Sequence, residues 1–203
     1  MQRQSPSIFN DIVDPTMIGP SSSHTCGPSR IGFLAQQLLP GTLKKATVAF
    51  AREGAYTMMY KGQRSDMGYV NGLLGRRPED PRLRNAFGEA EKAGVEVRFE
   101  IQDFPAIVPN ISHITLENSE GKQVIVHSDS TGGGTVKLLK IDDFDVSITG
   151  DCYELIVRAD CDTAELGHIC TYIQALNDRD EGSSISAREE RGLINLKYRT
   201  PLK

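Results

Sequence analysis

The sequence predicts a mixed α/β protein built from two modules. Stretches in which apolar residues recur every three or four positions alternate with stretches in which they recur every second position, as expected for helices that cover a sheet. This pattern pauses at Asp142-Asp143 and then starts again. The chain has 203 residues, of which 38% are hydrophobic, so it is long enough to bury a substantial core. We therefore expect a first domain over residues 1–144 and a second over residues 145–203.

The first predicted helix follows a segment rich in glycine and serine. Apolar residues recur at helical spacing between Ile31 and Leu38. Pro28 suits the first turn of such a helix, and Pro40-Gly41 ends it.

The other elements of the first module follow from the same two spacings, with Gly75 and Gly94 as helix stops. The predicted helices span 66–74 and 83–93, and the predicted strands span 46–50, 95–101, 111–116, 124–127 and 136–141.

The second module is predicted to begin with strands over 146–148 and 153–157. A helix over about 164–176 follows, and strands over 183–187 and 193–198 complete the pattern. We expect this order, β-α-β-β, to pack tightly on the first module because no obvious linker separates the two.

Composition excludes several classes of function. The net charge is −4 and the lysines and arginines are scattered, so a nucleic acid is not an expected partner. No apolar run is long enough for a membrane span and the N-terminus lacks the pattern of a signal peptide, so we expect a cytoplasmic protein. Four separated cysteines without a CxxC pair predict neither a metal site in this chain nor a disulfide framework.

The serine-rich stretch from Gly19 to Pro28 carries the strongest local signal for function. A segment rich in Gly, Ser and Thr that enters a helix presents free N–H groups, hydroxyls and the positive end of the helix dipole. Ser22, Ser23 and Thr25 would hold a carboxylate or phosphate there, and His24 would donate a hydrogen bond or move a proton. A plain capped turn is an equally good local interpretation.

Three other interpretations of local motifs remain to be weighed. A serine nucleophile activated by His24 is disfavoured, because neighbours in sequence seldom align Oγ with Nε2 and no Gly-x-Ser-x-Gly elbow is present. The triple glycine 132–134 predicts either a second wall of the same pocket or a flexible hairpin turn. Ser65 or Asp66 would cap the following helix.

Residues 17–25, MIGPSSSHT, followed by Gly27-Pro28 and Arg30, resemble the signature near the start of the iron–sulfur L-serine dehydratase β chain. The likeness spans most of residues 8–141 and continues through Gly54, Asp66, 72–75, Pro109-Asn110 and 130–134. The resemblance implies a mixed-sheet domain similar to the allosteric substrate-binding domain of phosphoglycerate dehydrogenase, followed by an ACT-like module.

The resemblance also implies an activity, the conversion of L-serine into pyruvate and ammonia without pyridoxal phosphate. In that family a [4Fe–4S] cluster acts as a Lewis acid on the substrate hydroxyl, and its cysteines belong to an α-type catalytic subunit. We therefore expect this chain to be inactive alone and to work in a homo-oligomer or heterotetramer. The residues and the resemblance together predict His24 as the catalytic residue and a set of substrate-binding residues, namely Ser22, Ser23, Thr25, Arg64, Asp66, Gly133 and Gly134.

Two departures from the family pattern keep other functions open. Where the family usually has Gly-His-Gly-Thr-Asp, residues 62–66 of this chain read Gly-Gln-Arg-Ser-Asp. Gln63 therefore stands in the place of a histidine, and its amide cannot shuttle protons as an imidazole does. Arg64 offers a clamp for a second acidic group, which favours a related lyase acting on a more anionic hydroxy-amino acid. The ACT-like βαββ module also stops before a second helix and fourth strand. These features favour, as a second hypothesis, a non-catalytic amino-acid-binding sensor.

Overall fold

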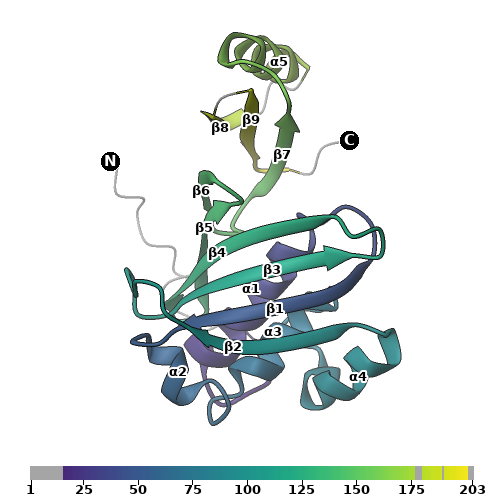
Figure 1. Ribbon diagram of the computed structural model, residues 1–203, viewed down its shortest axis with the longest axis vertical. Helices are drawn as coiled ribbons and strands as arrows, with labels where there is room; N and C mark the ends of the chain where they lie inside the picture. Colours follow the sequence, from purple (N-terminus) through teal and green to yellow (C-terminus); the bar gives the residue numbers. More distant parts are fainter. Residues whose placement is uncertain (1–15, 177–179, 189, 201–203) are drawn as a thin grey trace.

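The larger part of the protein is a six-stranded mixed sheet (Figure 1). The computed structural model describes residues 16–176, 180–188 and 190–200. The strands of this sheet are β1 (Leu43–Ala51), β2 (Glu96–Gln102), β3 (Ile111–Asn118), β4 (Gln123–Gly132), β5 (Thr135–Ile141) and β6 (Phe144–Ile148). They lie in the order β2-β1-β3-β4-β5-β6. β1 and β2 are parallel, and the other neighbouring pairs are antiparallel.

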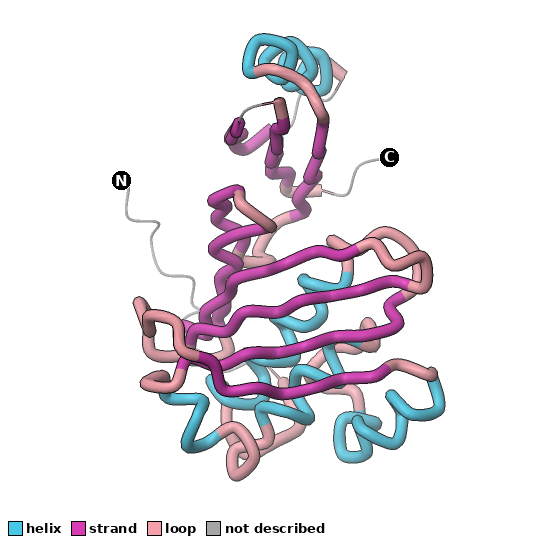
Figure 2. Tube along the Cα trace, viewed as in Figure 1, coloured by secondary structure: helices cyan, strands magenta, loops and turns pink. Residues whose placement is uncertain are grey.

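The helices of this part gather on one side of the sheet (Figure 2). They are a π-helical turn η2 (Ser22–Cys26), α1 (Gly27–Gln36), α2 (Ala55–Met59), α3 (Ser65–Leu73), a 3-10 turn η3 (Pro81–Asn85) and α4 (Ala86–Ala93). α2, α3 and α4 lie in the connection between β1 and β2, because parallel neighbours need a long crossover.

Alternation along the central strands separates the core from the open face. On β3, Ile114 and Leu116 are fully buried, whereas His113 and Thr115 between them are half-buried. Val126 on β4 is also fully buried beside them. The helix side of the sheet therefore carries the main core, and its other face presents polar side chains.

α1 and α3 cross at very close range. A side chain at Gly72 would overlap the carbonyl oxygen of Ser29, and one at Gly68 would overlap that of Thr25. Only glycine permits such an approach of two backbones. The contact therefore sets the start of α3 directly against the segment that begins α1.

A second, three-stranded sheet follows. Its elements are β7 (Tyr153–Ala159), α5 (Thr163–Ala175), β8 (Asp180–Arg188) and β9 (Arg191–Tyr198), and the strand order is β7-β9-β8. Asp162 caps α5 by accepting hydrogen bonds from the N–H groups of Ala164 and Glu165. Leu166 and Cys170 pack from the helix onto β9.

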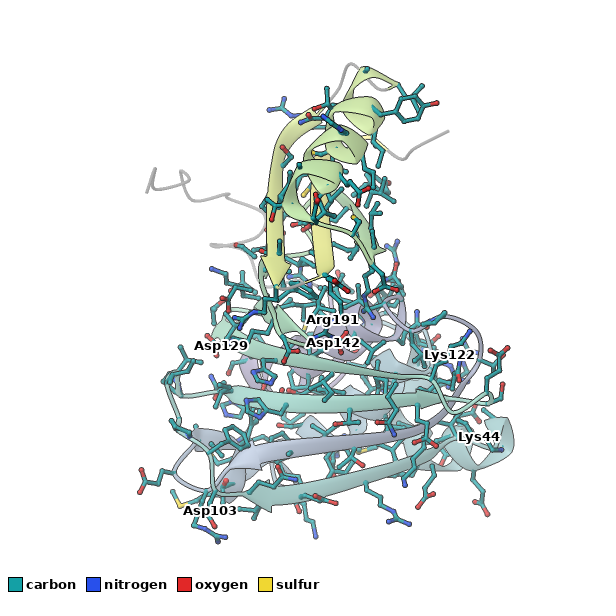
Figure 3. All side chains as sticks on the ribbon, turned by 45° about the horizontal axis from the view of Figure 1, so that its top comes forward. Lys44, Asp103, Lys122, Asp129, Asp142 and Arg191 are labelled. Atoms are coloured by element: carbon teal, nitrogen blue, oxygen red, sulfur yellow. The ribbon has the colours of Figure 1, made fainter. Side chains whose placement is uncertain are left out.

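The junction between the two sheets is polar at its edges and apolar at its centre. Arg191 forms an ion pair with Asp143 and Arg158 with Asp142, at 3.0 and 3.2 Å; Figure 3 places Arg191 and Asp142 at this junction. Leu193 of β9 is buried in the core of the larger sheet. In the described part of the chain, no helix has the length and apolar character needed to cross a membrane.

The mixed α/β class with two sheets is confirmed, and so is the order β-α-β-β from Tyr153 onward. One strand lies elsewhere than predicted. Residues 146–148, which we expected to open the second module, belong to β6 and pair with β5 in the larger sheet. The chain therefore passes from the larger sheet to the three-stranded sheet between Ile148 and Tyr153. The division into two domains and the likeness to phosphoglycerate dehydrogenase and ACT modules stay predictions.

Candidate functional site

The serine-rich segment forms a compact turn at the start of α1. Ser21 precedes the π-helical turn in an extended conformation, and its Oγ accepts a hydrogen bond from the N–H of His24 at 3.1 Å. Pro28 occupies the first turn of α1, as predicted. The first N–H groups of such a helical segment have no intrahelical acceptor, so the turn can hold an anion.

His24 is held in place through one ring nitrogen. Its Nδ1 lies 2.9 Å from Ser23 Oγ, whereas its Nε2 is buried without a hydrogen-bond partner among the described residues. Burial lowers the pKa of His24 below the ordinary value of 6.5, so the imidazole is neutral at neutral pH. A neutral ring with an unused nitrogen is suited to exchanging a proton with a bound group.

Thr25 joins the serine turn to the segment before α3. It is fully buried, and its hydroxyl donates a 2.7 Å hydrogen bond to the main-chain carbonyl of Gln63. The contact uses the backbone of Gln63, so it does not depend on the histidine-to-glutamine difference in this segment. The hydroxyl predicted to bind substrate thus makes a bond between two segments in this structure.

The cap of α3 differs from the prediction. Arg64, not Ser65 or Asp66, is the N-cap, and it adopts a left-handed conformation with φ of 58° and makes no side-chain cap. Asp66 instead lies in the first turn and accepts a hydrogen bond from the N–H of Met67, and Ser65 is fully buried. Burial raises the pKa of the half-buried Asp66. Arg64 is exposed beside it.

The triple glycine forms the turn of the hairpin between β4 and β5. Gly133 and Gly134 are its two central residues, and both have positive φ, of 58° and 78°. This arrangement is typical of the tight turns that join antiparallel strands. The hairpin interpretation of the sequence is therefore confirmed.

The hairpin also contacts the serine turn. Ser130 Oγ donates a 2.7 Å hydrogen bond to the carbonyl of Ser23, and Arg30 on α1 donates a 2.8 Å bond to the carbonyl of Gly134. Gly27 faces Ser130 so closely that any side chain there would overlap it. Three segments far apart in the sequence, 21–25, 63–66 and 130–134, thus come together.

Two residues beside the serine turn and the glycine hairpin were not predicted from the sequence. Tyr56 on α2 is fully buried, and its ring lies edge to face with His24 at a centroid distance of 5.4 Å. Asp129 is 7% exposed, and burial raises its pKa. Asp129 could have been singled out from the sequence, because it is an acidic residue at the end of an otherwise apolar alternation. No local signal marked Tyr56, because only the fold brings α2 to the serine turn.

The remaining histidines and the cysteines lie outside this assembly. His113 and His127 stack on each other on the open face of the sheet, with ring centroids 3.7 Å apart. None of the four cysteines forms a disulfide, and only Cys161 and Cys170 share a cluster. A [4Fe–4S] cluster needs three or four thiolates together, so the cysteines of this chain do not fit one. In the described residues, no three His, Cys, Asp or Glu side chains gather around a possible metal position.

The assembled segments define a class of protein, an α/β domain in which a serine-rich helix start lies beside a glycine hairpin. The chain belongs to the serine dehydratase beta chain family, whose model matches residues 11–131. It is 33% identical over 151 residues to the "Probable L-serine dehydratase, beta chain" of Bacillus subtilis (strain 168), covering 74% of this chain and 67% of the relative.

A second relative supports the same assignment. The chain is 28% identical over 149 residues to the "L-serine dehydratase, beta chain" of Peptoniphilus asaccharolyticus, covering 73% of this chain and 66% of that protein. The chain thus spans about two thirds of the length of these curated relatives.

Proposed function

We propose that this chain is the substrate-binding β subunit of a cytoplasmic L-serine dehydratase, which converts L-serine into pyruvate and ammonia. Membership of the serine dehydratase beta chain family supports the reaction class. The observation that carries the proposal is the contact of the serine turn with both the Gln63 segment and the glycine hairpin. The serine turn that leads into α1 holds the substrate carboxylate, because the N–H groups at the beginning of this turn and the helix dipole favour an anion.

In this proposal His24 is the residue that moves a proton. Its neutral imidazole has Nδ1 beside Ser23 and Nε2 unused, so it can accept a proton from a bound amino acid and release it again. Ser22, Ser23, Gly133 and Gly134 line the carboxylate position, and Thr25 fastens the turn to Gln63. Arg64 and Asp66 stand at the start of α3, where an exposed guanidinium also suits a more anionic hydroxy-amino acid.

A partner subunit completes the site in this proposal. Ser22, Ser23 and His24 are only half-buried, whereas ligand sites usually enclose most of a small ligand. The cysteines of this chain do not fit a [4Fe–4S] cluster, so the α-type subunit carries the cluster and its Lewis acid chemistry. The chain is accordingly inactive alone.

The test is an anaerobic assay of ammonia release from L-serine, with this chain alone, a candidate α-type subunit alone, and the two mixed. We expect release only in the mixture and co-purification of the two chains. Co-purification without release would point to a more anionic substrate. Binding of L-serine by this chain, without any association between the chains, would favour the sensor function instead.

A further inference from the structure

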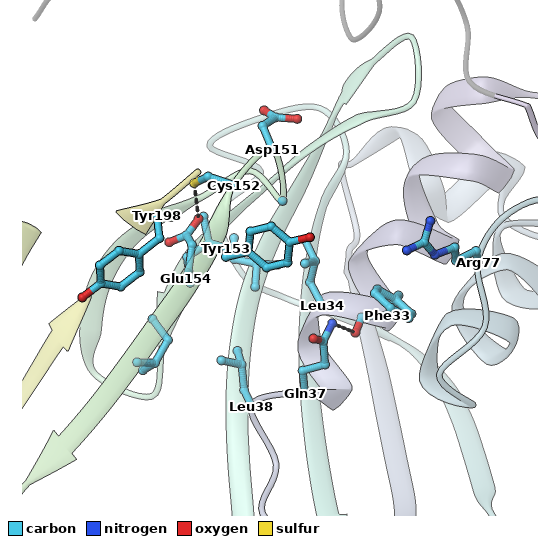
Figure 4. A pocket seen from close by; sticks show the side chains of 14 residues that line it. Phe33, Leu34, Gln37, Leu38, Arg77, Asp151, Cys152, Tyr153, Glu154 and Tyr198 are labelled. Atoms are coloured by element: carbon cyan, nitrogen blue, oxygen red, sulfur yellow. Dashed lines mark hydrogen bonds between the residues drawn. The ribbon is translucent and has the colours of Figure 1, made fainter. Parts of the chain in front are cut away.

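A groove lies between α1 and the second sheet, among residues that the proposed function does not use (Figure 4). Its volume is about 510 Å³, within the range of small-molecule sites. Its floor is aliphatic and aromatic. Phe33 and Leu34 of α1, and Leu38 just after it, face Leu138, Ile148 and Ile156 of three strands across it. A second hollow of about 300 Å³ shares Phe33, Leu34, Arg77 and Gly150 with the first.

The acidic side chains of the groove already have cationic partners. Glu154 is 7% exposed, accepts a 2.7 Å hydrogen bond from Asn195 Nδ2 and lies 3.7 Å from Lys197 Nζ. Asp151 lies 3.6 Å from the guanidinium of Arg30. Neither carboxylate therefore offers an uncompensated charge to a ligand.

Arg77 is different from these residues. Its side chain lines both hollows, yet it forms no salt bridge with any described residue. Figure 4 shows it entering from the side opposite Glu154, with Phe33 and Leu34 between them. The groove thus combines an apolar floor with the guanidinium of Arg77, while the carboxylate of Glu79 lines only the second hollow.

We propose that this groove binds a small monocarboxylate with a short aliphatic chain. A planar guanidinium pairs with a carboxylate through two parallel hydrogen bonds, which Arg77 can supply. The aliphatic chain covers the floor formed by Phe33, Leu34 and Leu38, where removal of apolar surface from water favours binding. Arg30, whose guanidinium donates to the carbonyl of Gly134, lines only the adjoining second hollow.

The test is a calorimetric titration of the full chain with three probes. These are 4-methylpentanoate, its neutral amide, and acetate, which carries the charge without the chain. We expect 4-methylpentanoate to bind at least tenfold more tightly than either of the others. Equal affinity for the acid and the amide, or saturable binding of none of them, would overturn the proposal.

Two matched variants locate the site. Arg77→Met should weaken 4-methylpentanoate binding at least tenfold and leave the amide unchanged, because only the acid uses the guanidinium. Arg84→Met removes another exposed arginine, which lies outside the groove, and this variant should bind as the unaltered chain does. Undiminished binding of the acid by Arg77→Met, in a chain whose circular dichroism is unchanged, would also overturn the proposal. None of these readouts depends on serine turnover.

Discussion

His24 owes its properties to two immediate neighbours and to its burial. Ser23 holds Nδ1, Tyr56 places a ring edge against the imidazole, and burial favours its neutral form. The serine-rich sequence was enough to nominate this residue, because hydroxyls and an imidazole before a helix are suited to binding and proton transfer. The neighbour on α2 could not be predicted, since its approach depends on how β1 and α2 pack.

A glutamine at this position tests the proton-transfer role. His24→Gln keeps a polar side chain that can bond to Ser23 but cannot accept and release a proton near neutral pH. In the assembled complex we expect kcat to fall by roughly a hundredfold or more, with a much smaller change in KM. Steady-state assays of serine deamination measure both constants.

The control for this prediction is His168→Gln, which alters an exposed histidine on α5. It should leave both constants unchanged. A normal kcat in His24→Gln would show that His24 does not transfer a proton, whereas a selective rise in KM would assign it to substrate binding only.

The crossing of α1 and α3 is the element-scale feature on which the site depends. Gly68 and Gly72 bring α3 against the start of α1, and this places Gln63 within hydrogen-bond distance of Thr25. Local spacing predicted both helices to within a few residues. It did not predict their closeness, because a glycine within a helical pattern equally suits a helix that touches nothing.

Other elements show the same difference between what the local sequence predicts and what depends on contacts between distant segments. Gly75 and Gly94 were predicted as helix stops, and both have positive φ, of 73° and 66°, which other residues seldom adopt. The strand 146–148 was predicted correctly as a strand but was assigned to the second module, whereas it pairs with β5 in the larger sheet. Its apolar alternation fits either sheet, and the tight turn at Asp142-Asp143 joins it to β5. The five-residue α2 was too short to show a helical period.

Gly72→Ala tests the importance of the close crossing. The added methyl group overlaps the carbonyl oxygen of Ser29, so the helices must move apart. We expect the free energy of unfolding to fall by about 1–3 kcal/mol, as for other overpacked sites. Urea titration monitored by circular dichroism measures the change.

The matched control is Gly167→Ala on α5, where a Cβ has no heavy atom within 4 Å. Alanine there should raise the free energy of unfolding by roughly 0.5–1 kcal/mol, because glycine is a poor helix former. Equal effects of the two substitutions would mean that the crossing is not tightly packed.

At the scale of the whole molecule, the stability should depend on the protonation of half-buried histidines. Burial, and next the neighbouring His127, lower the pKa of His113 to about 4, from an ordinary value of 6.5. The folded chain therefore binds fewer protons at His113 than the unfolded chain between these two pH values. By linkage, this residue's stabilising contribution is present above pH 6.5 and is lost as the pH falls towards 4.

His113→Phe should make this acid-side loss smaller. The phenyl ring preserves the stacking with Phe104 and His127 but does not titrate. Asp129, whose pKa burial raises, acts in the opposite direction in both proteins, so the difference between them reports His113 together with its coupling to the neighbouring His127. Urea unfolding at a series of pH values measures it, with His168→Gln as control. Parallel pH profiles for wild type and His113→Phe would refute the prediction.

The distances along the chain between the parts of the site have a consequence for protein synthesis. The hydrogen bond to the carbonyl of Ser23 comes from Ser130, which is 107 residues later in the chain. The hydrogen bond from Arg30 goes to the carbonyl of Gly134, which is 104 residues later. The serine turn leaves the ribosome early, yet it lacks its fixing contacts until β4 and β5 have been made. Because contacts of such long range form slowly, the site is assembled in one of the last steps of folding of the nascent first module.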